Sequence, residues 1–123
     1  MPYDEDDIFP IAKLIVNISQ ETRSANKSVT ALLDTGAGAN FINNTLAKNL
    51  KLKLFKLNDE NIFKRSNFLI CGATSYEKCT SVTHYVRVAI SINNITNETY
   101  NLLCFVGPFK EDLIIGLLRN HHL

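Results

Sequence analysis

One tripeptide in this sequence, Asp34-Thr35-Gly36, has residue types suited to acid–base chemistry. It follows the mostly apolar residues 29–33, and the apolar pair Phe41-Ile42 comes after a run of mostly small residues. A carboxylate at the end of an apolar strand is costly unless it is paired or hydrogen-bonded. Glycine lets the backbone approach closely, and the threonine hydroxyl can brace the turn. These features favour a functional carboxylate at Asp34.

A surface turn is the competing interpretation, because Asp, Thr and Gly all suit turns. The tripeptide alone is weak evidence, since it arises by chance in roughly one chain of this length in fifty. Surface turns are not usually enclosed by apolar segments, as residues 29–33 and 41–42 enclose this one. The flanking residues therefore favour the functional interpretation.

Short β-strands are expected to position this carboxylate. Residues 82–90 alternate between apolar and polar, which predicts a half-buried strand; a turn-like segment follows, and residues 100–106 predict its hairpin partner. Residues 12–18 and 29–33 predict a second hairpin, joined by an exposed loop over 20–28. The sequence therefore predicts an all-β domain.

Two short helices are expected to interrupt the strands. Asn44 or Thr45 can cap a helix that places Leu46, Ala47 and Leu50 on one side. Residues 117–122 predict a second helix. We expect one domain over residues 11–123, preceded by an acidic tail over residues 1–10.

Composition excludes several functional classes. The chain has 123 residues, 46% of them hydrophobic and 20% charged, which fits one globular domain. A net charge of +1 without a basic stripe argues against nucleic-acid binding. No apolar run is long enough for a membrane span.

The cysteines and histidines do not predict a metal site. Cys71, Cys79 and Cys104 are odd in number and lack metal-ligand spacing, so we expect reduced thiols in an intracellular, cytoplasmic protein. His84 and the pair at 121–122 have no Cys or carboxylate at ligand spacing. We expect neither a metal nor another cofactor.

Two segments carry a family resemblance. Residues 31–37, Ala-Leu-Leu-Asp-Thr-Gly-Ala, resemble the active-site signature of the retropepsins, the aspartic proteases of retroviruses and retrotransposons. Residues 105–108 and 113–118 resemble the late strand and the Ile-Ile-Gly turn of that family. Residues 67–82 between them stand where the family has its flap hairpin. The resemblance spans about residues 11–119.

The resemblance implies a closed β-barrel or sandwich with a flap hairpin and one or two short helices, forming half of a two-fold symmetric enzyme. One carboxyl cannot serve as both base and acid, and the chain has no second Asp-Thr-Gly or Asp-Ser-Gly, so a homodimer with one Asp34 from each subunit is implied. The two carboxyls would share one proton, which predicts activity at mildly acidic pH.

Roles for further residues also follow from the resemblance. Thr35 resembles the residue that hydrogen-bonds across the dimer, and the carbonyl of Gly36 would meet the substrate backbone. Residues 71–76 resemble the flap tip that closes over an extended peptide. For Ile70 and Ile115, core packing remains an equal alternative. The residues expected to bind substrate are Ala37, Ala39, Ile70, Cys71, Gly72, Ala73, Thr74 and Ile115.

This chain departs from the family pattern in two places. Gly38 and Leu117 stand where many retroviral members have an Asp and an Arg that form an ion pair. Loss of only one partner would leave a partly buried charge unpaired, so the absence of both is consistent. It favours a retrotransposon-type member. Residues 120–123 leave little for the usual C-terminal dimer strand, so we expect a different and weaker dimer, a boundary that precedes that strand, or a longer polyprotein.

The sequence thus predicts an aspartic endopeptidase that acts on an extended polypeptide, its own Gag-Pol-like polyprotein, in the cytoplasm or inside virus-like particles. Two alternatives remain open. One is a domesticated cellular protease that acts on host proteins. The other is a retropepsin-like module that dimerises or binds without catalysis.

Overall fold

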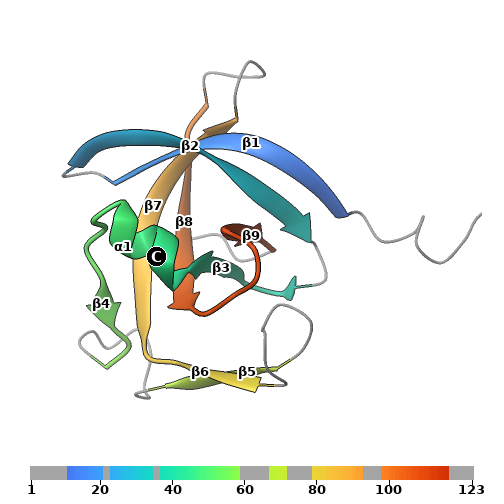
Figure 1. Cartoon of the computed structure of the whole chain (residues 1–123), viewed down its shortest axis with the longest axis vertical. Helices are drawn as coiled ribbons and strands as arrows, with labels where there is room; N and C mark the ends of the chain where they lie inside the picture. The colour runs from blue at the N-terminus through green and yellow to red at the C-terminus, as the bar shows by residue number, and fades with distance from the viewer. Residues whose placement is uncertain are drawn as a thin grey trace, which may run out of the picture.

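Nine β-strands and one short helix make up the part of the chain that the computed structural model describes, namely residues 11–20, 23–34, 37–58, 67–71, 79–92 and 98–116 (Figure 1). The all-β expectation is confirmed. The elements are β1 (Ile11–Gln20), β2 (Arg23–Asp34), β3 (Asn40–Asn43), α1 (Asn44–Asn49), β4 (Phe55–Lys56), β5 (Phe68–Cys71), β6 (Cys79–Val82), β7 (His84–Ile92), β8 (Tyr100–Gly107) and β9 (Leu113–Ile115).

Six of these strands close into a barrel in the order β1-β2-β9-β3-β8-β7, and the pairing of β1 with β7 completes the ring. β9 is parallel to β2 on one side and antiparallel to β3 on the other. The chain that leaves β2 therefore passes the end of β9 before it enters β3. β5 and β6 form a separate antiparallel hairpin, drawn below the barrel in Figure 1.

The barrel interior holds the main core, here called the inner cluster. It draws on all six barrel strands and on α1, because alternate residues of a strand face the same side. Its members are Val16, Ile18, Val29, Ala31, Ile42, Leu46, Ala47, Leu50, Val86, Val88, Ile90, Leu102, Cys104, Val106 and Leu113.

A second core, the outer cluster, lies on the opposite face of β3, β7, β8 and β9. Phe68 and Ile70 of β5 pack against it, and the rings of Phe68 and Phe105 are 5.4 Å apart. These strands are therefore apolar on both faces, as in sheets that are covered on both sides. The members of the outer cluster are Phe41, Leu57, Val82, Tyr85, Leu103, Phe105, Phe109 and Ile114.

Both predicted hairpins are present as β1–β2 and β7–β8. The expected exposed loop over residues 20–28 is wrong, since Gln20 belongs to β1 and residues 23–28 belong to β2. Polar residues can extend a hairpin when they pair across it, and here Ser28 Oγ donates to Asn17 Oδ1 over 2.9 Å. The strand expected over 82–90 is interrupted at Thr83, between β6 and β7.

The helix after β3 is confirmed as α1, but its cap is Asn43 rather than Asn44 or Thr45. Asn43 Oδ1 accepts from the backbone N–H groups of Thr45 and Leu46. The acidic tail at 1–10 and the helix at 117–122 lie outside the described residues. No helix in the described part of the chain is long and apolar enough to cross a bilayer.

Candidate active site

Asp34 is the last residue of β2 and is half-buried. Its neighbour Leu33 is the register partner of Ile115 in β9, and Asp34 itself lies opposite Ile11 in β1. Since side chains alternate along a strand, Asp34 shares the face of Leu32, which packs against the outer cluster. The carboxylate therefore stands at the strand end, on the face where the outer cluster lies.

The chain returns toward β3 through Ala37, Gly38 and Ala39, whereas Thr35 and Gly36 lie outside the described residues. Gly38 has a φ of 75°, in the left-handed region that favours glycine, and a Cβ there would meet no atom within 4 Å. Backbone conformation rather than crowding thus explains a glycine at this position.

Gly116, directly after β9, packs backbone to backbone against this returning segment. A Cβ on Gly116 would overlap the carbonyl oxygen of Ala39 and lie 2.9 Å from its nitrogen. The end of β9 therefore approaches the segment after Asp34 as closely as only glycine permits.

The residues expected to bind substrate fall into four groups. Ala37, Ala39 and Ile70 pack against the outer cluster, on the side of the sheet that Asp34 shares. Ile115 packs against the inner cluster, so its observed contacts are those of a core residue. Cys71 is exposed at the end of β5. Gly72, Ala73 and Thr74 lie outside the described residues.

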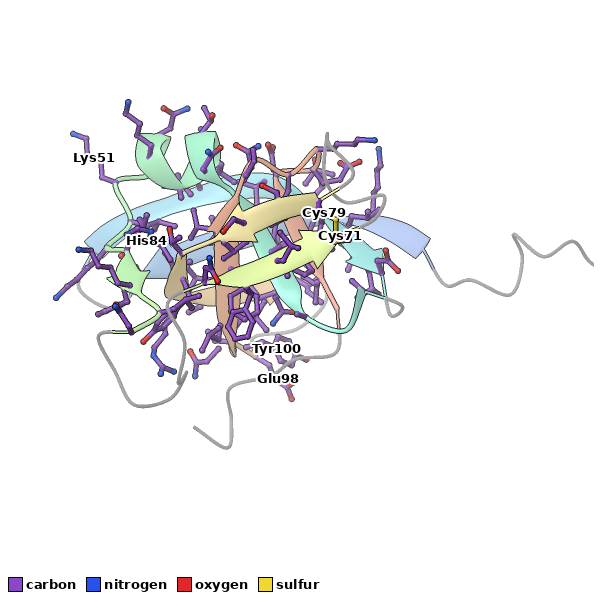
Figure 2. All side chains as sticks on the ribbon, turned by 90° about the horizontal axis from the view of Figure 1, so that it is seen from below. Lys51, Cys71, Cys79, His84, Glu98 and Tyr100 are labelled. Carbon is purple, nitrogen blue, oxygen red and sulfur yellow. A yellow bond between two sulfur atoms is a disulfide. The ribbon has the colours of Figure 1, made fainter. Side chains whose placement is uncertain are left out.

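A disulfide joins Cys71 to Cys79, which corrects the expectation that these thiols are reduced (Figure 2). The two cysteines are register partners at the end of the β5–β6 hairpin. Sequence spacing could not identify this pair, because the hairpin register determines which residues lie opposite each other. Cys104 remains a buried free thiol, and burial raises its pKa to about 12.

Sequence reasoning also missed Asn40, the first residue of β3. Its side chain is fully buried, with Nδ2 donating to the carbonyl of Leu103 over 3.1 Å and Oδ1 accepting from the N–H of Gly116 over 2.9 Å. The available signal was an asparagine directly before the apolar Phe41-Ile42, but asparagine is also common in turns.

Metal-ligating side chains do not gather in the described part of the chain, where no three His, Cys, Asp or Glu residues come together. His84 lies in β7, as predicted, and its Nδ1 is 2.8 Å from the hydroxyl oxygen of Thr83. The described residues thus supply an acid–base group at Asp34 and no evident metal centre beside it.

No family model fits this chain, and no curated protein is significantly similar to it. A functional assignment therefore rests on the sequence motif and on the surroundings of Asp34.

Proposed function

We propose that this protein is an aspartic endopeptidase that acts as a homodimer, with Asp34 of each copy forming the catalytic pair. The observation that carries the proposal is the location of Asp34 at the end of β2, on the face where the β5–β6 hairpin packs against the outer cluster. Residues on both sides of the carboxylate, Leu32 and Ala37, pack against that same cluster.

This arrangement suits an extended peptide. A two-stranded hairpin can bind a substrate backbone by adding it as a further strand, and pockets for alternate side chains then give specificity. Ala37, Ala39 and Ile70 are small or apolar, so they would accept hydrophobic side chains near the scissile bond. In the retropepsin-like interpretation, β5 and β6 form the base of the flap.

The chemistry requires two carboxyl groups. The ionised carboxyl takes a proton from water as the water oxygen bonds to the scissile carbonyl carbon, and the neutral carboxyl protonates the carbonyl oxygen. The C–N bond then breaks as the first carboxyl passes the proton that it took from water to the amide nitrogen, while the second carboxyl takes back a hydroxyl proton and leaves the carboxylic acid product. Because two facing carboxylates repel each other, the pair holds one proton between them, which favours activity at mildly acidic pH.

The substrate class follows from the retropepsin resemblance of residues 31–37 and 113–118. We propose an extended polypeptide, namely a Gag-Pol-like polyprotein that contains this domain. A domesticated cellular protease would use the same two carboxyls on host proteins.

Cleavage of a peptide library at about pH 5, with and without pepstatin, tests the proposal. Asp34→Asn should abolish cleavage, because the amide can act neither as the base nor as the acid. Asp112→Asn is a matched control, since Asp112 is an exposed carboxylate outside the candidate site. Cleavage that survives in Asp34→Asn would refute the aspartic mechanism. A folded dimer that cleaves nothing would favour the non-catalytic alternative.

Mixing wild-type chains with Asp34→Asn chains tests the half-site. If each active dimer needs an intact Asp34 from each of its two copies, activity at constant total protein should fall as the square of the wild-type fraction. Activity that falls in simple proportion to that fraction, or a monomer in sedimentation that still cleaves, would contradict a shared site.

A further inference from the structure

The buried amide of Asn40 is the feature that the proposed mechanism leaves unused. Among the described residues only Asn40 and Gln20 are buried polar side chains, and Asn40 is 0% exposed whereas Gln20 is 8% exposed. Burying an amide is costly unless it is hydrogen-bonded, so the role of Asn40 follows from the hydrogen bonds that its side chain makes.

Asn40 joins three parts of the barrel. Its Oδ1 accepts from the N–H of Gly116, just after β9, over 2.9 Å. Its Nδ2 donates to the carbonyl of Leu103 in β8 over 3.1 Å. The amide thus uses its acceptor and its donor at once, a combination that neither a hydrocarbon nor a carboxylate of the same shape provides.

Gly116 is the point at which this amide reaches the candidate site. On one side of β9, Ile115 pairs with Leu33, the residue before Asp34. On the other side, Gly116 is held by Asn40, which opens β3 after the chain has passed Asp34. The two ends of the segment that carries Asp34 are therefore fixed to two consecutive residues of the chain.

We propose that Asn40 is a positioning residue that fixes the Asp34 segment against the end of β9, so that Asp34 meets its symmetry mate in the geometry that catalysis needs. This inference rests on the proposed function. A positioning residue of this kind lowers kcat far more than it raises KM when it is lost, because small displacements of a catalytic group cost rate rather than ground-state binding.

Asn40→Asp is the most informative variant. When protonated, the introduced carboxyl can still donate to Leu103 and accept from Gly116, but when ionised it can only accept and faces the carbonyl oxygen of Leu103. Ionisation of the introduced carboxyl should therefore disturb the Asp34 segment, and its protonation in acid should restore the contacts that the amide makes. The neighbouring thiol of Cys104, the register partner of Asn40, has its pKa raised to about 12 and stays neutral throughout.

Gln20→Glu provides the matched control. Gln20 Nε2 donates to the carbonyls of Lys53 and Arg87, and its Oε1 accepts from the N–H of Lys53, so the same amide-to-carboxyl change occurs in a network that does not include the Asp34 segment. Both variants should lose stability on ionisation, and circular dichroism gives the folded fraction for each.

The expected result is a loss in kcat of about 100-fold per folded molecule for Asn40→Asp where the introduced carboxyl is ionised, with KM changed by less than about threefold and with recovery where that carboxyl is protonated. Gln20→Glu should retain wild-type kcat per folded molecule. The inference is overturned if both variants lose activity only in proportion to their unfolded fractions. It is also overturned if Asn40→Asp keeps its kcat at a pH where the ¹³C resonance of the introduced carboxyl shows that it is ionised and its donation to the Leu103 carbonyl is lost.

A structural measurement separates this inference from the proposed function. If the wild-type chain cleaves nothing, the protease proposal fails, but the ¹³C resonance of the Asp34 carboxyl still reports its position. That resonance should move in Asn40→Asp and stay in place in Gln20→Glu. An unmoved resonance in Asn40→Asp refutes the positioning role without any reference to activity.

Discussion

The N–H of Gly116 donates to Oδ1 of Asn40 over 2.9 Å, although 76 positions separate the two residues in the chain. The same glycine packs against the backbone of Ala39. These contacts bring the end of β9 onto the segment that follows Asp34, and they depend on a residue without a side chain at position 116. Position 116 is therefore sensitive to substitution.

Gly116→Ala should destabilise the fold, because the added Cβ would overlap the carbonyl oxygen of Ala39 and backbone atoms cannot rotate away. We expect a loss of about 1–3 kcal/mol in the free energy of unfolding, measured by urea denaturation. Gly38→Ala is the comparison: its Cβ meets open space, but the φ of 75° adds a cost of about 1–2 kcal/mol.

Gly38→Asn should destabilise the fold much less than Gly38→Ala, because asparagine tolerates the left-handed region. Gly116→Asn should destabilise it at least as much as Gly116→Ala, because asparagine still carries a Cβ. Equal stability of Gly116→Ala and the wild type would contradict the close approach to Ala39.

Asn43→Ala should lower stability by about 1–2 kcal/mol, since Asn43 Oδ1 caps α1 at the N–H groups of Thr45 and Leu46. Its Nδ2 also donates to the carbonyl of Phe109 over 2.7 Å. Asn43→Asp keeps the cap and loses that donor, so thermal denaturation of both variants separates the two contributions. Asn44→Ala, one residue inside the helix, should change little, and an equal loss there would refute the assigned cap.

The sequence was sufficient to predict those features that depend on local pattern. Alternating residues predicted the β7–β8 hairpin and two short apolar segments predicted β1–β2. A polar residue before Leu46 indicated α1 within one or two positions of its cap. The place of Asp34 at the end of a strand was likewise readable from its apolar flanks. Each of these signals lies within a few residues of the feature that it predicts.

Features that depend on register could not be predicted in this way. Asn40 contacts Leu103 and Gly116, which are 63 and 76 positions away, and the residues next to Asn40 in the sequence do not predict either partner. Cys71 and Cys79 are joined because the hairpin places them opposite each other. A shift by one residue would have turned them to opposite faces, so the pair is a property of the folded strands.

Reduction of the Cys71–Cys79 disulfide should loosen the β5–β6 hairpin and leave the barrel folded. The bond closes a short loop, with a sequence separation of 8, so the chain-entropy model gives about 2–3 kcal/mol. Hydrogen exchange with and without dithiothreitol should show faster exchange confined to residues 68–71 and 79–82. Cys104→Ala should respond to the reductant as the wild type does, and no change in either protein would contradict a stabilising bond.

Cys104 provides a prediction about pH. Its thiol is fully buried, and desolvation of the thiolate raises its pKa from the ordinary value of 9.0 to about 12. Below about pH 9 both the folded and the unfolded chain hold this proton, so the thiol contributes no pH dependence. Between about 9 and 12 the unfolded chain releases the proton while the folded chain keeps it, so stability falls as pH rises.

Over that range the wild type should lose up to about 1.4 kcal/mol of unfolding free energy per pH unit more than Cys104→Ala loses. Urea denaturation of the two proteins at about pH 8 and about pH 10 measures this difference and cancels the titration of the other groups they share.

The burial of Cys104 should also keep its thiol unreactive toward a disulfide reagent in the folded state. Labelling should then proceed only as fast as the chain unfolds, and rapid labelling of the native protein would show that Cys104 is accessible.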